Sequence, residues 1–143
     1  MQPKTKKAHV AMPAYTGLIA LVDFPSMNEA QMNEAVQFEA HKYVPMALDD
    51  VALSWDIVGR RSTDEGEGGM EVLLVAALKK EVARYQGYIE KEILDMNLLE
   101  IETFSIVRSL IDTTPGARLL IDLGSRATNV ILTEGGTVKL GRN

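Results

Sequence analysis

Hydrophobic and polar residues alternate along the chain with two periods, one typical of strands and one typical of helices. Residues 8–12 and 18–24 are mostly apolar, and residues 13–17 between them have the composition of a turn. In residues 51–57 every second side chain is apolar, which predicts a half-buried strand. Residues 70–78 are apolar almost throughout, a pattern typical of a strand buried on both faces.

Apolar residues at helical spacing mark two longer segments. Ser26 is a candidate N-cap, and Glu29 follows three residues later as in a capping box. The helix that begins there is predicted to end before Pro45, because proline cannot continue a helix. Residues 79–96 carry a second apolar stripe and predict a longer helix.

The remaining elements follow in short succession. Strands are predicted at residues 98–103, 117–123, 127–133 and 137–140, and a short helix at residues 104–111. The predicted order is therefore ββ, α, ββ, α, β, α, βββ, and the predicted fold class is α/β. Within it, residues 26–103 are expected to form an α+β unit with two helices in one layer on a three-stranded sheet. Four side chains are expected to be buried between these layers: Val36, Leu53, Trp55 and Tyr85.

Residues 59–69 are polar and rich in glycine, and they are predicted to form a hairpin loop. Such a segment can resemble a phosphate-binding loop. Here no Gly-Lys-Ser/Thr sequence follows and the tip is acidic, so a phosphate role is not expected for this loop.

Composition narrows the functional classes. The chain has 143 residues, 46% of them hydrophobic, which suits one domain or two small subdomains. A net charge of −5 disfavours a general nucleic-acid surface. Without cysteine there is no disulfide, thiolate metal site or cysteine nucleophile, and His9 and His41 lie far apart in sequence. The longest apolar run, residues 72–78, is too short to span a bilayer, so a cytoplasmic location is predicted.

The segment "IDLGSRATNV", residues 121–130, has the pattern of a strand, a glycine turn and a second strand. Backbone N–H groups in such a turn can point at a phosphate, and a carboxylate at the strand end, here Asp122, can hold Mg²⁺ through water. The alternative is an ordinary β-turn in which Asp and Gly have their usual roles. This segment by itself leaves both interpretations open.

Three segments together resemble one family. They are "FEAHKYVPMALDDVALSWDIVG" at residues 38–59, "EVLLVAALKKEVARY" at residues 71–85, and "LLIDLGSRATNVILTEGGTVKLGRN" at residues 119–143. In their order and spacing they resemble PilM-type proteins of type IV pilus assembly. That family is actin-like, and it is similar to the cell-division protein FtsA and to the cytoplasmic part of the secretion protein GspL.

The resemblance implies a division of the chain into four parts. Residues 1–25 are similar to the end of the first actin-like lobe, and residues 26–103 to the inserted, SHS2-like interaction subdomain called 1C. Residues 104–116 correspond to a connecting helix and turn. Residues 117–143 resemble the start of the second lobe, with strands of the ribonuclease H-like type. The family's first phosphate motif would lie before Met1 and its adenine-binding region after Asn143, so the chain is expected to be a fragment.

The same resemblance implies ATP and Mg²⁺ as cofactors of the full-length protein. The expected cofactor-binding residues are Asp122, Gly124, Ser125, Arg126, Thr128 and Asn129, with Asp122 holding the metal indirectly. The family often has a hydroxyl five residues after the Asp, where this chain has Ala127 followed by Thr128. Binding is therefore expected more than turnover, no catalytic residue is assigned, and the isolated chain is expected to have little ATP affinity.

The implied partner is the cytoplasmic tail of a PilN-like inner-membrane protein, with other pilus assembly components beyond it. The resemblance indicates a groove between the first lobe and 1C, which we expect to be flanked by Phe24-Pro25 and by Glu102 and Phe104. Core packing of Phe24 and of Phe104 is the alternative. Two other functions stay open: a kinase or ATPase of the same superfamily, and an FtsA-like division protein.

Overall fold

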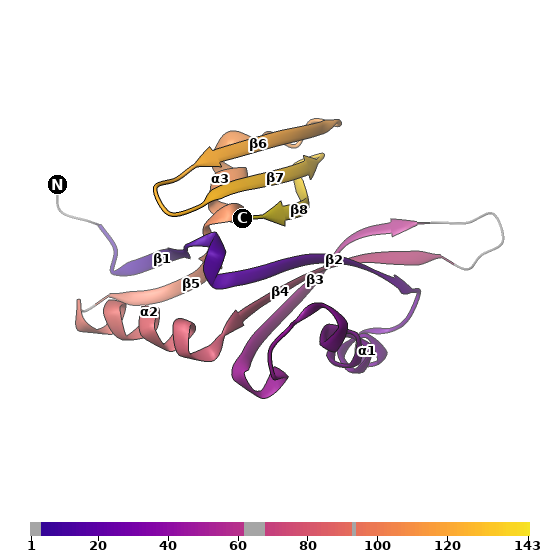
Figure 1. The fold of residues 1–143 in the computed structure, drawn as a ribbon, viewed down its shortest axis with the longest axis horizontal. Helices are drawn as coiled ribbons and strands as arrows, with labels where there is room; N and C mark the ends of the chain where they lie inside the picture. Colours follow the sequence, from indigo (N-terminus) through magenta and orange to yellow (C-terminus); the bar gives the residue numbers. More distant parts are fainter. Residues whose placement is uncertain (1–3, 62–67, 93) are drawn as a thin grey trace.

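The computed structural model describes residues 4–61, 68–92 and 94–143 (Figure 1). The elements occur in the predicted order. They are β1 (Lys7–Met12), η1 (Ala14–Thr16), β2 (Gly17–Pro25), α1 (Glu29–Tyr43), η2 (Leu48–Asp50), β3 (Val51–Arg61), β4 (Gly69–Leu78), α2 (Lys79–Lys91), β5 (Asp95–Ile101), α3 (Glu102–Leu110), β6 (Ala117–Leu123), β7 (Thr128–Glu134) and β8 (Thr137–Arg142). No helix among the described residues is long and apolar enough to cross a membrane.

The strands form three sheets whose pairing differs from the predicted one. β1 and β5 pair in parallel, β2, β4 and β3 form an antiparallel sheet, and β6, β7 and β8 form another. The expectation that residues 26–103 supply all three strands of the middle sheet is wrong. β2 pairs with β4 from Gly17 to Pro25, whereas β5 leaves to pair with β1. Apolar alternation marks a strand but does not name its partner, and a boundary at residue 25 therefore separates β2 from its own sheet.

One face of the β2–β4–β3 sheet is covered by α1. Val36 and Met32 of the helix are almost fully buried against Val72 and Leu74 of β4. The helix begins later than predicted, since Asn28 is the N-cap and forms a capping box with Gln31. Ser26–Glu29 and Asn28–Gln31 both have the three-residue spacing of a capping box, so spacing alone does not distinguish them. The predicted N-cap, Ser26, is wrong by two residues. At residue 26 the chain is still leaving β2, and Ser26 N–H donates to the Gly68 carbonyl.

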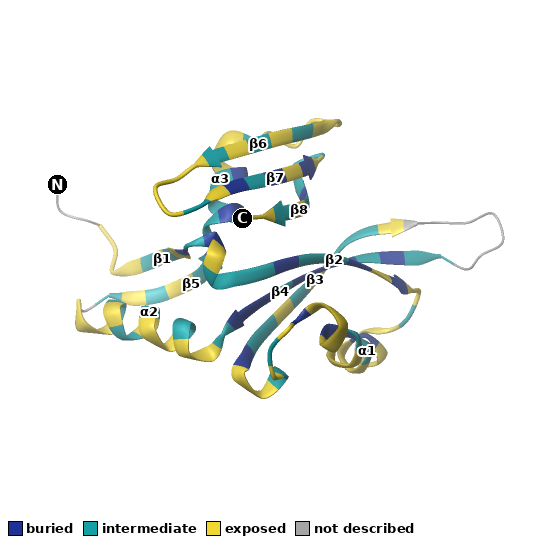
Figure 2. Ribbon diagram, in the orientation of Figure 1, coloured by how far each residue is buried: buried dark blue, intermediate teal, exposed yellow. Residues whose placement is uncertain are grey.

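The other face of this sheet is covered by α3 and by the C-terminal sheet. Ile19 and Leu73 point to this side and pack with Ile101, Val107, Ile131 and Val138. A half-buried ion pair joins the two sheets, with Lys139 Nζ 2.6 Å from Glu71 Oε2. The central strand β4 is therefore buried on both sides, as its apolar sequence predicts (Figure 2).

α2 differs most from its prediction. The helix ends at Lys91 and β5 begins at Asp95, so the end of the predicted helix at residues 92–96 is wrong. Asp95 N–H donates to the Lys6 carbonyl, and this pairing with β1 takes the segment out of the helix. The helix lies beside β5 rather than in one layer with α1, which also contradicts the prediction (Figure 1).

Burial follows from this arrangement. Of the four side chains predicted to be buried, Val36 is buried, whereas Leu53, Trp55 and Tyr85 are only half-buried. Leu53 and Trp55 pack at the margin of the α1 cluster, and α2 has no buried residue of its own.

The predicted hairpin between β3 and β4 is present, but the strands reach further into it. β3 continues through Gly59 to Arg61, and β4 begins at Gly69. The prediction of a loop from residue 59 is therefore wrong at that end. Its central residues, 62–67 including Gly66, lie outside the described part of the chain. The strand register shifts between Ile57 and Gly59, and this bulge keeps the pairing going past the glycine.

Candidate phosphate-binding site

The predicted phosphate residues lie together at one end of the β6–β7 hairpin. Asp122 on β6 and Asn129 on β7 are cross-strand partners, and Asn129 Nδ2 donates to Asp122 Oδ2 at 2.8 Å. Strand alternation turns both side chains toward the body of the protein, on the same face as the buried Ile131. Asn129 is 4% exposed, so the hydrogen bond is held in a dry setting.

The turn between these strands is closed by backbone geometry. Gly124 N–H donates to the Ala127 carbonyl at 3.0 Å. A Cβ atom at Gly124 would lie 2.8 Å from that carbonyl oxygen, so only glycine fits this turn without a shift. Ser125, Arg126 and Thr128 are exposed around it, and they are accessible to a ligand that approaches the turn.

Glu102, which the sequence analysis assigns to the partner groove, lies at this hairpin instead. Its Oε1 accepts a hydrogen bond from Ala14 N at 2.8 Å and one from Asn129 Nδ2 at 3.4 Å. Glu102 directly follows β5, and Ala14 follows shortly after β1. The parallel pair therefore delivers both residues to the same edge, where ligands of α/β sheets commonly bind.

A second contact joins the turn to η1. Arg126 Nη1 donates to the Tyr15 hydroxyl at 3.2 Å, and the guanidinium carbon lies 5.9 Å from the centre of the tyrosine ring. The hairpin is thus connected to the short segment Ala14–Thr16 both by Glu102 and by Arg126. Residues 13–17 were predicted only as a turn, and their sequence pattern does not indicate that this turn lies beside the candidate site.

These residues fit a phosphate-bound metal ion. Asn129 Oδ1 is buried and has no hydrogen-bond partner within the described ranges, so the amide keeps an acceptor unused. Carboxylate and amide oxygens are the donors that Mg²⁺ prefers, and a turn that admits only glycine allows a phosphate close to the backbone. When present, the metal would neutralise phosphate charge, Asp122 would hold it through water, and Asn129 would fix the Asp122 carboxylate.

The four residues predicted to flank a partner groove are not brought together. Phe24 is 6% exposed and packs in the α1 cluster, whereas Phe104 packs in the cluster on the opposite face of the sheet. Pro25 pairs with Gly69 at the far end of β2. The chain leaves the β1–β5 pair at η1 and again between β5 and α3, at Glu102, so Glu102 lies at a crossing as predicted but Phe24 and Pro25 do not.

A polar cluster on either side of Glu102 joins Glu100 of β5 to Ser105 and Arg108 of α3. Glu100 Oε2 accepts from Arg108 Nη1 at 3.0 Å, and its Oε1 accepts from the Ser105 hydroxyl at 2.6 Å. Chiefly the Arg108 hydrogen bond, with help from Ser105, lowers the pKa of the Glu100 carboxyl. The carboxylate is therefore charged at neutral pH and connects the end of β5 to α3.

The fold is shared with solved structures. One chain of a PilM–PilN type IV pilus biogenesis complex superposes with a TM-score of 0.82 at 21% identity, covering 98% of this chain and 43% of that one. The cytoplasmic domain of EpsL, an inner-membrane component of the type II secretion system of Vibrio cholerae, gives a TM-score of 0.64 at 14% identity, covering 94% and 49%. The chain therefore shares the α/β fold of these solved structures, and it spans less than half the length of these neighbours.

The family is shown by the sequence itself. The family model described as "Type IV pilus assembly protein PilM" matches residues 1–138, and the chain belongs to that family. A search of curated proteins finds no match. The family resemblance stated from three sequence segments is thus confirmed.

Proposed function

We propose that this chain is part of a cytoplasmic, actin-like adaptor of type IV pilus assembly that binds the tail of a PilN-like inner-membrane protein. Support comes from the family match and from the neighbour solved as a PilM–PilN complex. The neighbour is more than twice as long as the matched region, so the partner, the nucleotide and the location are all part of the proposal.

The observation that carries the proposal is a cavity between the β1–β5 pair and the rest of the protein. Its volume is about 220 Å³. Met12, Met96 and Leu99 line it from the parallel pair, while Ala52 and Val75 line it from the β2–β4–β3 sheet. α2 contributes Val82 and Gln86 to the same cavity. A small, mostly apolar cavity between two structural units suits one or two apolar side chains of an extended peptide.

We therefore move the proposed groove from its predicted residues to this cavity, which also lies between two structural units. The groove was expected between the first lobe and 1C, and the cavity lies between the strands that pair in parallel and the β2–β4–β3 sheet with α2. Phe24 and Pro25 are not part of it, and Glu102 and Phe104 do not line it either. Ser54 and Gln86 line it and are exposed, so substitutions there change the groove without disturbing a core.

A tail-binding assay tests the proposal. A fluorescent peptide with the sequence of a PilN-like tail is titrated with the family protein that contains this chain. Ser54→Glu and Gln86→Glu are expected to weaken binding at least tenfold, because each places a charge among apolar side chains. Gln37→Glu on the outer face of α1 is the matched control. Loss of binding in the control, with binding intact in the two groove variants, would contradict the assignment.

ATP binding at the hairpin is the second part of the proposal. Asp122→Ala in the longer protein should weaken Mg-ATP binding, since it removes the carboxylate and the shorter of the two hydrogen bonds that Asn129 Nδ2 donates. The 143-residue chain by itself should bind weakly, because one turn supplies few of the donors that a nucleotide needs. Micromolar binding of Mg-ATP to the isolated chain, measured by calorimetry, would show that this part is wrong.

Hydrolysis is the second candidate function, and one observation favours it. Glu102 places a second carboxylate next to Asn129, where it can orient a water molecule toward a bound phosphate. Glu102→Gln keeps the side chain's shape and removes its charge. If the protein is an ATPase, this variant should lose turnover while retaining nucleotide binding. If it is only an adaptor, neither wild type nor variant should release phosphate above background.

A further inference from the structure

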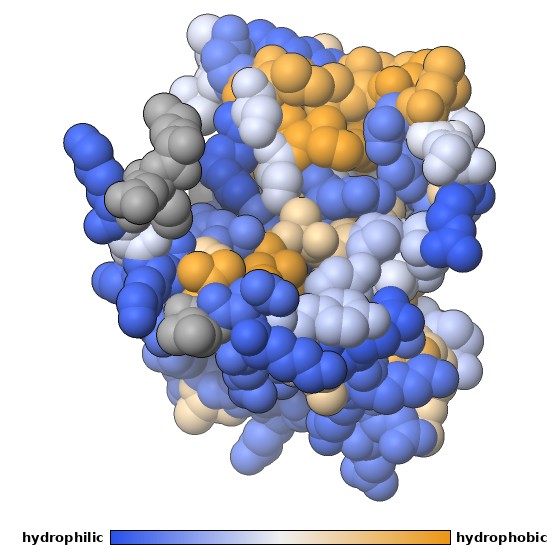
Figure 3. Space-filling model, turned by 90° about the vertical axis from the view of Figure 1, so that its left-hand side faces the viewer, coloured by the Kyte–Doolittle hydropathy of each residue, from blue (hydrophilic) through white to orange (hydrophobic). Residues whose placement is uncertain are grey.

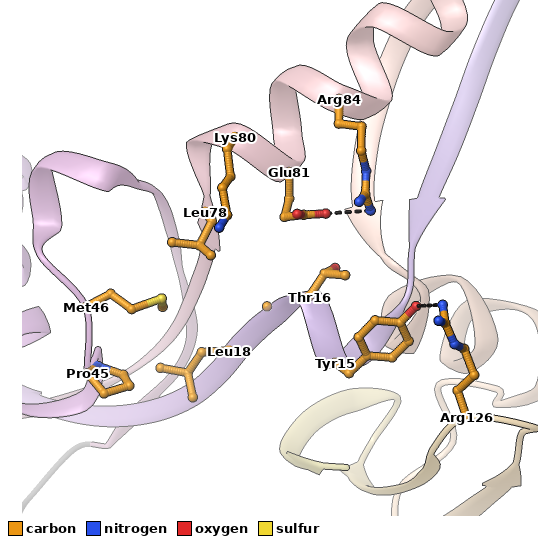
Figure 4. A pocket seen from close by; sticks show the side chains of 11 residues that line it. Tyr15, Thr16, Leu18, Pro45, Met46, Leu78, Lys80, Glu81, Arg84 and Arg126 are labelled. Carbon is orange, nitrogen blue, oxygen red and sulfur yellow. Dashed lines mark hydrogen bonds and ion pairs between the residues drawn. The ribbon is translucent and has the colours of Figure 1, made fainter.

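A second cavity lies where α2 begins. It is larger than the tail groove, which is the cavity proposed above for the PilN-like tail, lined by Met12, Met96 and Leu99 among others. Its volume is about 470 Å³, and it shares no lining residue with the groove described above. Figure 4 shows that its walls come from the start of α2, from η1 and the start of β2, from the segment after α1, and from the hairpin turn. Four parts of the chain that are distant in sequence therefore meet around it.

One end of this cavity is apolar. Leu18, Pro45, Met46 and Leu78 gather there, from three different segments (Figure 4). Leu18 and Leu78 are half-buried, so each presents part of its side chain to the cavity. An apolar recess of this kind gains free energy when a ligand's hydrocarbon side chain removes it from water.

Cations lie along the cavity, with Lys80 beside the apolar end and Arg126 at the opposite end (Figure 4). Lys80, Arg84 and Arg126 line the cavity, and Glu81 is the one carboxylate among its described lining residues. That excess of cations occurs on a chain whose net charge is −5. Glu81 forms an ion pair with Arg84, with 2.5 Å between Glu81 Oε2 and Arg84 Nη2. The other two cations are therefore left without a lining carboxylate.

These two cations, Lys80 and Arg126, have N–H donors that no described residue uses. Lys80 is exposed and has no hydrogen bond or ion pair with the described chain. Arg126 uses one N–H for the Tyr15 hydroxyl, and its guanidinium offers further N–H groups in the planar arrangement that matches a carboxylate. The first turn of α2 adds to this, because its N-cap, Leu78, supplies no side-chain acceptor for the helix N–H groups.

We propose that this cavity binds an acidic, leucine-containing segment of a partner protein. The apolar end would take a hydrocarbon side chain, Lys80 would take a carboxylate next to it, and Arg126 would take one at the opposite end. Charge complementarity selects this occupant: the protein is acidic overall, and it presents cations beside an apolar recess here. The site lies on residues that the tail groove does not use, so the adaptor would hold two different peptides at once.

Fluorescence anisotropy with the 143-residue chain tests this. The test peptide is fluorescein-labelled Glu-Leu-Glu-Glu-Leu. Saturable binding that weakens with added salt is expected, since exposed charge pairs are screened. Lys80→Glu should weaken it about tenfold, because one attraction becomes a repulsion. Lys91→Glu is the matched control: it makes the same charge change at the other end of α2, far from the cavity, and should leave binding within about twofold.

Three further measurements decide between explanations. A peptide with Lys in place of Glu should not bind, and one with Ser in place of Leu should bind more weakly. Ser54→Glu in the tail groove should leave binding of the acidic peptide unchanged, so failure of the tail proposal and failure of this one can be told apart. No saturable binding, equal loss in Lys80→Glu and Lys91→Glu, or displacement of the peptide by inorganic phosphate at equal concentration would each overturn the proposal. Displacement by phosphate would assign the cations to the hairpin instead.

Discussion

The two three-stranded sheets of this protein differ in how their faces are covered. The β2–β4–β3 sheet has α1 on one face and the C-terminal sheet on the other, so its central strand, β4, is buried on both faces. Within the described ranges, the C-terminal sheet is covered on one face only. Its other face carries leucines that are cross-strand neighbours, Leu119, Leu132 and Leu140, with Ile121 and Leu123 beside them.

The uncovered face is visible as an apolar area in Figure 3, at the height of the C-terminal sheet. Leu123 is 80% exposed and Leu119 is 61% exposed, whereas Leu74 of the middle sheet is 3% exposed. Both sheets have apolar strands, so apolar sequence does not report which faces are buried within this chain. The difference teaches that local pattern gives the strand and that only the surrounding elements give its burial.

The largest difference in stability between the two sheets is expected from a pair of Leu→Ala substitutions. Leu74→Ala should lower the free energy of unfolding by about 3 kcal/mol, because it leaves a cavity in a closed core. Leu123→Ala makes the same chemical change on the uncovered face and should stay within about 0.5 kcal/mol. Urea denaturation followed by tryptophan fluorescence measures both. Equal losses would mean that the leucine face is covered in solution, and a dependence on protein concentration would then identify self-association.

The ion pair between the sheets gives the next largest effect. Lys139 and Glu71 side chains are each 19% exposed. A double-mutant cycle with Lys139→Met and Glu71→Gln should give a coupling energy of about 1 kcal/mol. The exposed pair Lys42–Glu39 on α1 is the control and should give less than about 0.5 kcal/mol. If the two couplings are equal, the contact between the sheets is looser than the structure shows.

Two glycines should respond with opposite signs to substitution by alanine. Gly87 lies inside α2 with no atom near the position of an added Cβ, so Gly87→Ala should stabilise the protein by about 0.5–1 kcal/mol. Gly124→Ala should destabilise it, because the added Cβ meets the Ala127 carbonyl. Thermal unfolding followed by circular dichroism distinguishes the two. A stabilising Gly124→Ala would mean that the hairpin turn has another shape.

The smallest expected effect is a pH dependence at the end of β5. The folded state lowers the pKa of Glu100, chiefly through the Arg108 hydrogen bond, so this group stabilises the fold above its unfolded pKa. That contribution is lost as the pH falls through the lowered, folded pKa. Glu100→Gln should therefore lower the melting temperature by about one degree at pH 7 and leave it nearly unchanged at the acidic end. A difference that stays constant across this range would exclude the ion pair as its cause.

Much of the fold could be predicted from the sequence, as particular elements show. β4 was identified as a doubly buried strand from its apolar run, and the β6–β7 hairpin from its Asp-Leu-Gly turn. The order of the helices and strands was predicted correctly, because apolar period and turn composition are local properties. The pairing of β2 and β5 was not, since two apolar strands look alike until long-range contacts select their partners.

At the candidate site the sequence determined the hairpin residues from Asp122 to Asn129, whose cross-strand contact follows from a short turn. It did not determine that Glu102 and Tyr15 lie beside them. Those residues are 27 and 111 positions away from their hydrogen-bond partners Asn129 and Arg126. Only the parallel pairing of β1 with β5 brings their segments to the hairpin, because a contact between distant segments depends on the whole chain's packing and not on any local pattern.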